Sequence, residues 1–245
     1  SEAVKENTQQ RTNPLPAGDV LRALMVAMDQ WVSCGIPPPP SRYPKVGDGT
    51  LVRSNRKSTG FPNIPGVRYS GLHNRQLFLD YGANTHRGRM DLYPPRRIGN
   101  GGYTVLVPKV DRDGNDLAGI RLPAIQVPLG TYTGWNLRPR SLAEDELSGL
   151  LGSYIPFAKT RAQRRNTGDS RLSIEERYKD HAHYVRQVSR VARMLVNERF
   201  LLPEDTERMI SEATKAQIFG RKAPGRGSYR SQRRARQRGY AKHTS

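Results

Sequence analysis

Residues 103–129 read YTVLVPKVDRDGNDLAGIRLPAIQVPL and carry the strongest local structural signal in the chain. Residues 103–110 are typical of a strand, residues 117–127 of its partner, and the acidic segment 111–116 of the turn between them. An Asp-Gly pair between apolar segments is the strongest short signal for a β-hairpin. The sequence therefore predicts a hairpin here and, with the helices described below, a mixed α+β fold.

The acidic turn also has the composition of a calcium-binding loop, but its spacing disagrees. An EF-hand loop places glycine at its sixth position and a bidentate glutamate at its twelfth. Counted from Asp111, Gly114 is the fourth residue and Leu122 is the twelfth. The spacing therefore favours a plain hairpin turn over a calcium site.

The clearest helical periodicity covers residues 19–34, where apolar residues recur at three- and four-residue steps. Asp19 is a suitable N-cap and Gly35 a suitable stop. Because polar positions are few, we expect this helix to pack against a sheet or another helix over most of its surface. We therefore expect Trp31 and the methionines in the core, and Cys34 buried or half-buried.

Further helices are predicted in the C-terminal third. Two serine-based capping boxes occur at residues 141–144 and 173–176, and the first predicts a helix to about residue 151. Residues 180–200 have one apolar face and a second face rich in arginine, and Pro203 opens another helix. Residues 41–100 lack periodicity and predict irregular structure.

The charge of the chain is strongly positive, with 41 Lys+Arg against 22 Asp+Glu and a net charge of +19. No stretch approaches the roughly 20 apolar residues of a transmembrane helix. The single cysteine excludes a disulfide scaffold. The first residues lack signal-peptide features. These observations leave the compartment unknown, with the cytoplasm slightly favoured.

Ten of the cations follow Glu212, and no acidic residue follows it. Residues 219–245 are too poor in apolar side chains to form a core, so we expect a disordered basic tail. Such a tail can neutralise nucleic-acid phosphates, although a solvated terminus without a dedicated partner fits equally well. The candidate nucleic-acid residues are Arg221, Lys222, Arg226, Arg230, Arg233, Arg234, Arg236 and Arg238.

Motifs for catalysis or metal binding are incomplete. No serine has the glycines of a Gly-x-Ser-x-Gly nucleophile elbow, and no phosphate or dinucleotide loop is present. The only close histidine pair, His181 and His183, would point to different sides of a helix. The residues themselves therefore predict no catalytic residue, no metal site and no cofactor.

Several ordered segments resemble the C-terminal region of a bacterial family of α/β-hydrolase-domain proteins. They are DGN at 113–115, AGIRLP at 118–123, VPLGTYTGWNLR at 127–138, GSYIPFAKT at 152–160, SIEERY at 173–178, LLPED at 201–205, NP at 13–14 and PPSRYP at 39–44. The resemblance covers about residues 13–215.

This resemblance implies a serine hydrolase acting on esters or amides, but it supplies no catalytic position in this chain. The helix at 19–35 would be the final helix of the hydrolase sheet, so the nucleophile and the histidine would lie upstream of Ser1. The implied division is a polar linker at 1–18, this helix, a family-specific extension at 36–218 and the basic tail. The implied partner is the N-terminal hydrolase part, and whether this chain is itself an enzyme stays open.

Within the extension, the loop at residues 131–135 is a candidate border of the substrate pocket. The two residues that this prediction names are Tyr132 and Trp135. Core packing of the same loop is the alternative, and the sequence favours it.

Overall fold

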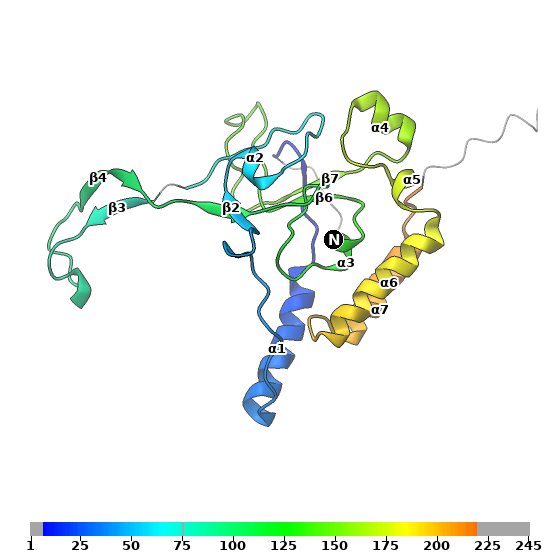
Figure 1. The fold of residues 1–245 in the computed structure, drawn as a ribbon, viewed down its shortest axis with the longest axis horizontal. Helices are drawn as coiled ribbons and strands as arrows, with labels where there is room; N and C mark the ends of the chain where they lie inside the picture. The colour runs from blue at the N-terminus through cyan, green and yellow to red at the C-terminus, as the bar shows by residue number, and fades with distance from the viewer. Residues whose placement is uncertain (1–6, 75, 220–245) are drawn as a thin grey trace, which may run out of the picture.

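The computed structural model describes residues 7–74 and 76–219, which form a mixed α+β fold (Figure 1). Its strands pair in three small antiparallel sheets: β1 (Arg11–Thr12), β7 (Ser153–Pro156) and β6 (Gly130–Thr133) in that order; β2 (Leu51–Arg53) with β5 (Leu106–Pro108); and β3 (Leu77–Asp80) with β4 (Arg96–Gly102). The helices are α1 (Ala17–Cys34), α2 (Arg56–Thr59), the 3₁₀ helix η1 (Thr85–Arg87), α3 (Pro123–Gln126), α4 (Arg161–Thr167), α5 (Ile174–Arg177), α6 (His181–Asn197) and α7 (Pro203–Lys215).

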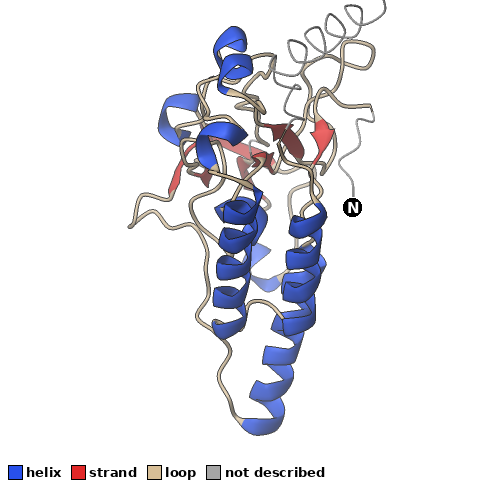
Figure 2. Cartoon of the chain, turned by 90° about the vertical axis from the view of Figure 1, so that its right-hand side faces the viewer, coloured by secondary structure: helices blue, strands red, loops and turns tan. Residues whose placement is uncertain are grey.

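The main core forms where α6 and α7 lie side by side as a helical pair (Figures 1 and 2). Asp180 caps α6 by accepting a hydrogen bond from the His183 amide, and the predicted apolar face of the helix is turned inward. The buried side chains of this face are Tyr184, Val188, Val191, Ala192 and Leu195. The helix predicted at residues 180–200, its apolar face and the helix opened by Pro203 are therefore confirmed.

The predicted hairpin is wrong. Strand β5 pairs with β2, and Leu51 lies opposite Pro108. The expected partner strand instead contains α3, and a single bridge between Val110 and Asp116 closes the acidic turn. Pro123 starts α3 because its fixed backbone angle suits a first helical turn. The acidic segment forms the predicted turn, but the distant strand β2 supplies the partner of β5.

The helix expected at residues 141–151 is also absent. This segment forms turns, and Ala143 and Asp145 have φ angles of 49° and 68°, which a right-handed helix excludes. The second capping box is confirmed: the Ser173 side chain and Glu176 satisfy each other's backbone amides at the start of α5.

Helix α1 forms where predicted, although it starts at Ala17, so that Asp19 lies in the first turn and is not the cap. Gly35 ends it in the left-handed region with a φ of 67°. The helix projects from the body (Figure 1), and only Asp19, Ala23 and Ala27 are buried. The expectation of core positions for Trp31 and the methionines is wrong, and Cys34 is exposed.

Strands β3 and β4, with residues 81–95 between them, form a second projection that we call the arm (Figure 1). Every residue of both strands is exposed or half-buried, and the rings of Phe78 and Tyr103 meet at the base of the arm with centroids 4.5 Å apart. A two-stranded hairpin alone is at best marginally stable in water. The arm therefore relies on packing at its base.

Residues 7–18, within the predicted linker, are tied to the body. Strand β1 pairs with β7, and Thr8 is almost fully buried. Among the described residues, no helix is long and apolar enough to cross a membrane, and no cluster of side chains suits a metal ion. The predicted basic tail lies outside the described residues, apart from residue 219.

Candidate functional site

Three aromatic rings from separate segments meet beside strand β5. Phe61, Tyr69 and Trp135 have ring centroids 5.3 to 5.9 Å apart. The rings, together with Val107 and Gly134, line a hollow of about 250 Å³, which we call the aromatic hollow. Aromatic walls of this kind bind apolar groups by burying their surface.

Hydrogen bonds from the β6–β7 sheet fix the position of Trp135. Its carbonyl oxygen accepts from the Thr133 hydroxyl at 2.5 Å and from the Ser153 hydroxyl at 2.6 Å. On the other wall, the Tyr69 hydroxyl donates to the Ser54 carbonyl at 2.7 Å. The aromatic hollow is therefore built on fixed backbone positions.

A second hollow, of about 490 Å³, lies at the base of the arm and shares Ser54 with the first. Arg53 and Arg97 line it, and its lining contains no acidic residue. Neither guanidinium forms an ion pair with a described residue, and Arg97 donates only to the Asn100 carbonyl at 3.2 Å. We call it the arginine hollow; its local charge is positive.

Between the two hollows, Ser54 Oγ lies 3.1 Å from His73 Nδ1, a serine–histidine contact of the kind that can activate a nucleophile. The same Nδ1 lies 3.2 Å from the Gly71 carbonyl oxygen, which can only accept a hydrogen bond. With the proton on Nδ1, this contact is a hydrogen bond to Gly71 and Nδ1 cannot accept the proton of Ser54; with the proton on Nε2, Nδ1 accepts from the Ser54 hydroxyl. Within the part of the chain that the structure describes, no carboxylate orients His73. The pair therefore lacks the geometry of a catalytic triad.

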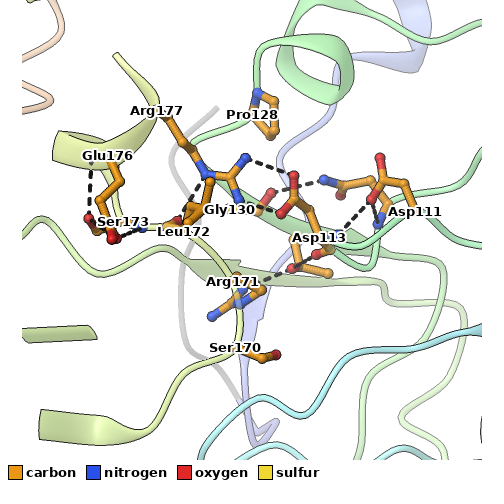
Figure 3. Close-up of polar contacts among 12 residues, drawn as sticks. Asp111, Asp113, Pro128, Gly130, Ser170, Arg171, Leu172, Ser173, Glu176 and Arg177 are labelled. Atoms are coloured by element: carbon orange, nitrogen blue, oxygen red, sulfur yellow. Dashed lines mark hydrogen bonds and ion pairs between the residues drawn. The ribbon is translucent and has the colours of Figure 1, made fainter. Parts of the chain in front are cut away.

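A buried ion pair joins the acidic turn to the C-terminal third (Figure 3). The Arg177 guanidinium forms a two-pronged contact with the Asp113 carboxylate, and its central carbon lies 4.0 Å from the centre of the Phe157 ring. Such a paired arrangement suits arginine and not lysine. Asp113 of the acidic turn is therefore paired with a protein cation.

A second ion pair, Arg171 with Asp169, is almost fully buried, with side chains 2% and 8% exposed and a shortest contact of 2.7 Å. Arg171 also donates to the Thr131 hydroxyl at 2.8 Å and to the Ile155 carbonyl at 3.0 Å. The guanidinium thus binds β6 and β7 together behind the aromatic hollow.

Asn115 completes the connection between the acidic turn and β6. Its side chain is fully buried, accepts from the Tyr132 amide at 2.7 Å and donates to the Gly130 carbonyl at 3.2 Å. Gly114 has a φ of 82°, and a Cβ there would lie 2.8 Å from the Thr131 methyl group. The DGN motif therefore holds the acidic turn against β6.

The two residues predicted to border the pocket lie in different surroundings in the structure. Trp135 lines the aromatic hollow, whereas Tyr132 packs against Tyr154 with ring centroids 5.0 Å apart and lines neither hollow. Burial raises the pKa of the Tyr132 hydroxyl. Whether the aromatic hollow borders a substrate pocket stays a prediction. The nucleic-acid candidates Arg221 to Arg238 lie outside the described residues.

Sequence reasoning missed the contact of Ser54 with His73 and the two unpaired arginines. Ser54 and His73 are 19 residues apart, and Arg53 and Arg97 lie on different sheets. No motif spacing links any of them, and only the meeting of β2, β5 and the base of the arm brings them together.

The geometry thus defines a mixed α+β protein with two adjoining hollows supported by buried ion pairs. The alpha/beta hydrolase domain family matches the chain over residues 1–211, so the chain belongs to that family. No curated protein and no solved structure shows significant similarity to it. The family expected from the sequence is therefore confirmed.

Proposed function

We propose that this chain is the non-catalytic part of an α/β-hydrolase protein, which acts on esters or amides once a catalytic part of the same family binds to it. The catalytic part supplies the nucleophile and the histidine. This chain supplies framework and borders the substrate pocket at Trp135.

The observation that carries the proposal is the open apolar face of α1. Leu21, Met25, Met28 and Val32 form one stripe along the helix and are 59%, 71%, 63% and 76% exposed. The opposite side, with Ala23 and Ala27, packs on the body. A helix apolar on two sides is suited to lie between two layers, here the body of this chain on one side and a sheet on the other. The second layer that fits this stripe is the hydrolase sheet.

Two further features support the assignment of the catalytic groups to another part. All strand pairs in the described ranges are antiparallel, whereas the nucleophile elbow belongs at the end of a strand in a hydrolase sheet. Among the residues that the structure describes, no carboxylate orients His73 in its contact with Ser54.

The first test is covalent labelling of the purified chain with a serine-directed fluorophosphonate. We expect no labelled serine and no hydrolysis of a generic ester above background. Labelling at Ser54, or at any other serine of this chain, would refute the proposal.

The second test measures binding of the chain to a catalytic part of the same family, produced as a separate polypeptide. Met25→Glu and Val32→Glu should each weaken binding by about tenfold or more, because each places a charge in an apolar contact. Ser33→Glu is the matched control, since Ser33 is exposed on the same helix. Equal effects of all three substitutions would contradict a role for the apolar stripe.

A further inference from the structure

The two hollows that meet at Ser54 differ in chemistry, and together they form one elongated site. The aromatic hollow offers rings for an apolar group, and the arginine hollow offers two guanidinium groups without carboxylate partners in the described structure. We propose that this site binds a carboxylic acid that carries an aryl or short alkyl group. The acid group lies between Arg53 and Arg97, and the apolar group lies against Trp135.

Charge orients the ligand. Asp116 lines the aromatic hollow but not the arginine hollow, so a carboxylate is repelled at one end and attracted at the other. Exposed arginines with free donors bind carboxylates by charge-assisted hydrogen bonds, often in pairs. None of the described residues that line the arginine hollow is acidic, so no carboxylate among them competes with the ligand for the two guanidinium groups.

The junction between the hollows adds a neutral donor. The Ser54 hydroxyl lines both hollows and lies 3.1 Å from His73 Nδ1, and in the tautomer with the proton on Nδ1 it is free to donate to a ligand oxygen. Ser54 and His73 thereby act as a positioning pair and form no covalent bond. The choice of a carboxylate over other anions rests on the proposed function, because ester cleavage releases a carboxylic acid.

At the edge of the arginine hollow, the lack of a side chain at Gly102 lets β4 pair closely with β3. Gly102 lies against β3, where a Cβ would come within 2.6 Å of the Gln76 carbonyl oxygen, so a side chain at this position would displace the strand. Arg53 reaches the hollow from β2 and Arg97 from β4, so the two guanidinium groups are held by separate sheets.

The test uses Trp135 as the reporter. The chain has two tryptophans, so Trp31→Phe leaves Trp135 as the only strong fluorophore. Titration with 3-phenylpropionate should change its emission with a saturable curve at millimolar concentrations. The uncharged analogue 3-phenylpropanol, and acetate, which lacks a ring, should each bind at least about tenfold more weakly.

Arg53→Gln combined with Arg97→Gln should weaken binding of 3-phenylpropionate by about tenfold or more. Arg186→Gln combined with Arg190→Gln is the matched control, since both arginines are exposed on α6 and have no ion pair in the described structure. Circular dichroism confirms that each variant is folded.

Four results would overturn the site: no saturable signal, equal binding of the alcohol, an equal loss in the α6 control, or displacement by inorganic phosphate at equal concentration. The last result would assign the hollow to a phosphate. None of them bears on the assignment of the catalytic groups to another part or on the role of the α1 stripe, which fluorophosphonate labelling and the α1 substitutions test separately.

Discussion

At the scale of single residues, a buried charge decides where the C-terminal third contacts the sheet of β1, β7 and β6. Arg171 contacts Asp169, Thr131 and two carbonyl oxygens of β7 while 2% exposed. A buried ion pair adds little net stability over an apolar pair of the same shape, but removal of one partner leaves a buried charge without compensation. The geometry of this one side chain therefore holds β6 and β7 in place.

Arg171→Met should lower the free energy of unfolding by about 3–5 kcal/mol, because the Asp169 carboxylate stays buried without its cation. Urea denaturation at neutral pH measures the change. Arg186→Met, at an exposed arginine without an ion pair in the described structure, should stay within about 0.5 kcal/mol.

If Arg171→Met alone does not fold, the double variant Asp169→Asn/Arg171→Met should recover folding, because it removes both charges. A loss below about 1 kcal/mol in the single variant would show that the ion pair does not anchor the sheet.

At the scale of elements, the start of the short helix α5 depends on Glu176. Its carboxylate accepts from the Arg164 guanidinium at 2.7 Å and from the Ser173 amide at 3.0 Å. The hydrogen bond with Arg164 lowers the pKa of Glu176 from 4.5 to about 2. The contribution of the charged form to stability is therefore complete above pH 4.5 and is lost as the pH falls toward 2.

Glu176→Gln should destabilise the protein at pH 7, and the difference from the unsubstituted chain should shrink as the pH falls from 4.5 to 2. Gln retains an acceptor for the Ser173 amide but loses the charge that Arg164 binds. Thermal melts across this pH range measure the effect, with exposed Glu207→Gln as the control. A difference that does not depend on pH would contradict the assigned pKa.

At the scale of the whole molecule, one ion-pair cluster ties the projecting helix α1 to α7. Asp19 and Asp205 are buried, and each contacts both Arg22 and Arg208, with distances of 2.5 to 3.3 Å. The hydrogen bond with Arg22 lowers the pKa of Asp205. Because the far stripe of α1 is open, this cluster and the Ala23–Ala27 contact hold the helix on the body.

Asp19→Asn should therefore loosen α1 more than the rest of the protein. We expect faster amide hydrogen exchange along α1 and a loss of about 1–3 kcal/mol in unfolding free energy, since the two arginines remain partly solvated. Asp29→Asn, on the exposed part of the same helix, is the control. Unchanged exchange in α1 would show that the cluster does not dock the helix.

The elements that the sequence predicted correctly are those governed by neighbouring residues. The extent of α1, the apolar face of α6, the Ser173 capping box and the Gly35 stop depend on side chains within a few positions. The wrong predictions depended on distant partners. Strand β5 pairs with β2, a segment with little pattern of its own, and the segment after Ser141 forms turns in which the Asp145 carboxylate accepts a hydrogen bond from the distant Gln9.

Local periodicity and capping chemistry thus determined the long helices without any structure, while matched segments carried the family resemblance and a motif search showed the lack of a nucleophile elbow. Only the tertiary structure decided that the apolar stripe of α1 is exposed and that the DGN turn is hydrogen-bonded to β6. It also decided that the hollow lined by Arg53 and Arg97 meets the hollow lined by Trp135 at Ser54. The physical reason is distance along the chain: helix formation is set by contacts three or four residues apart, whereas hollows and buried ion pairs join segments that no local pattern relates.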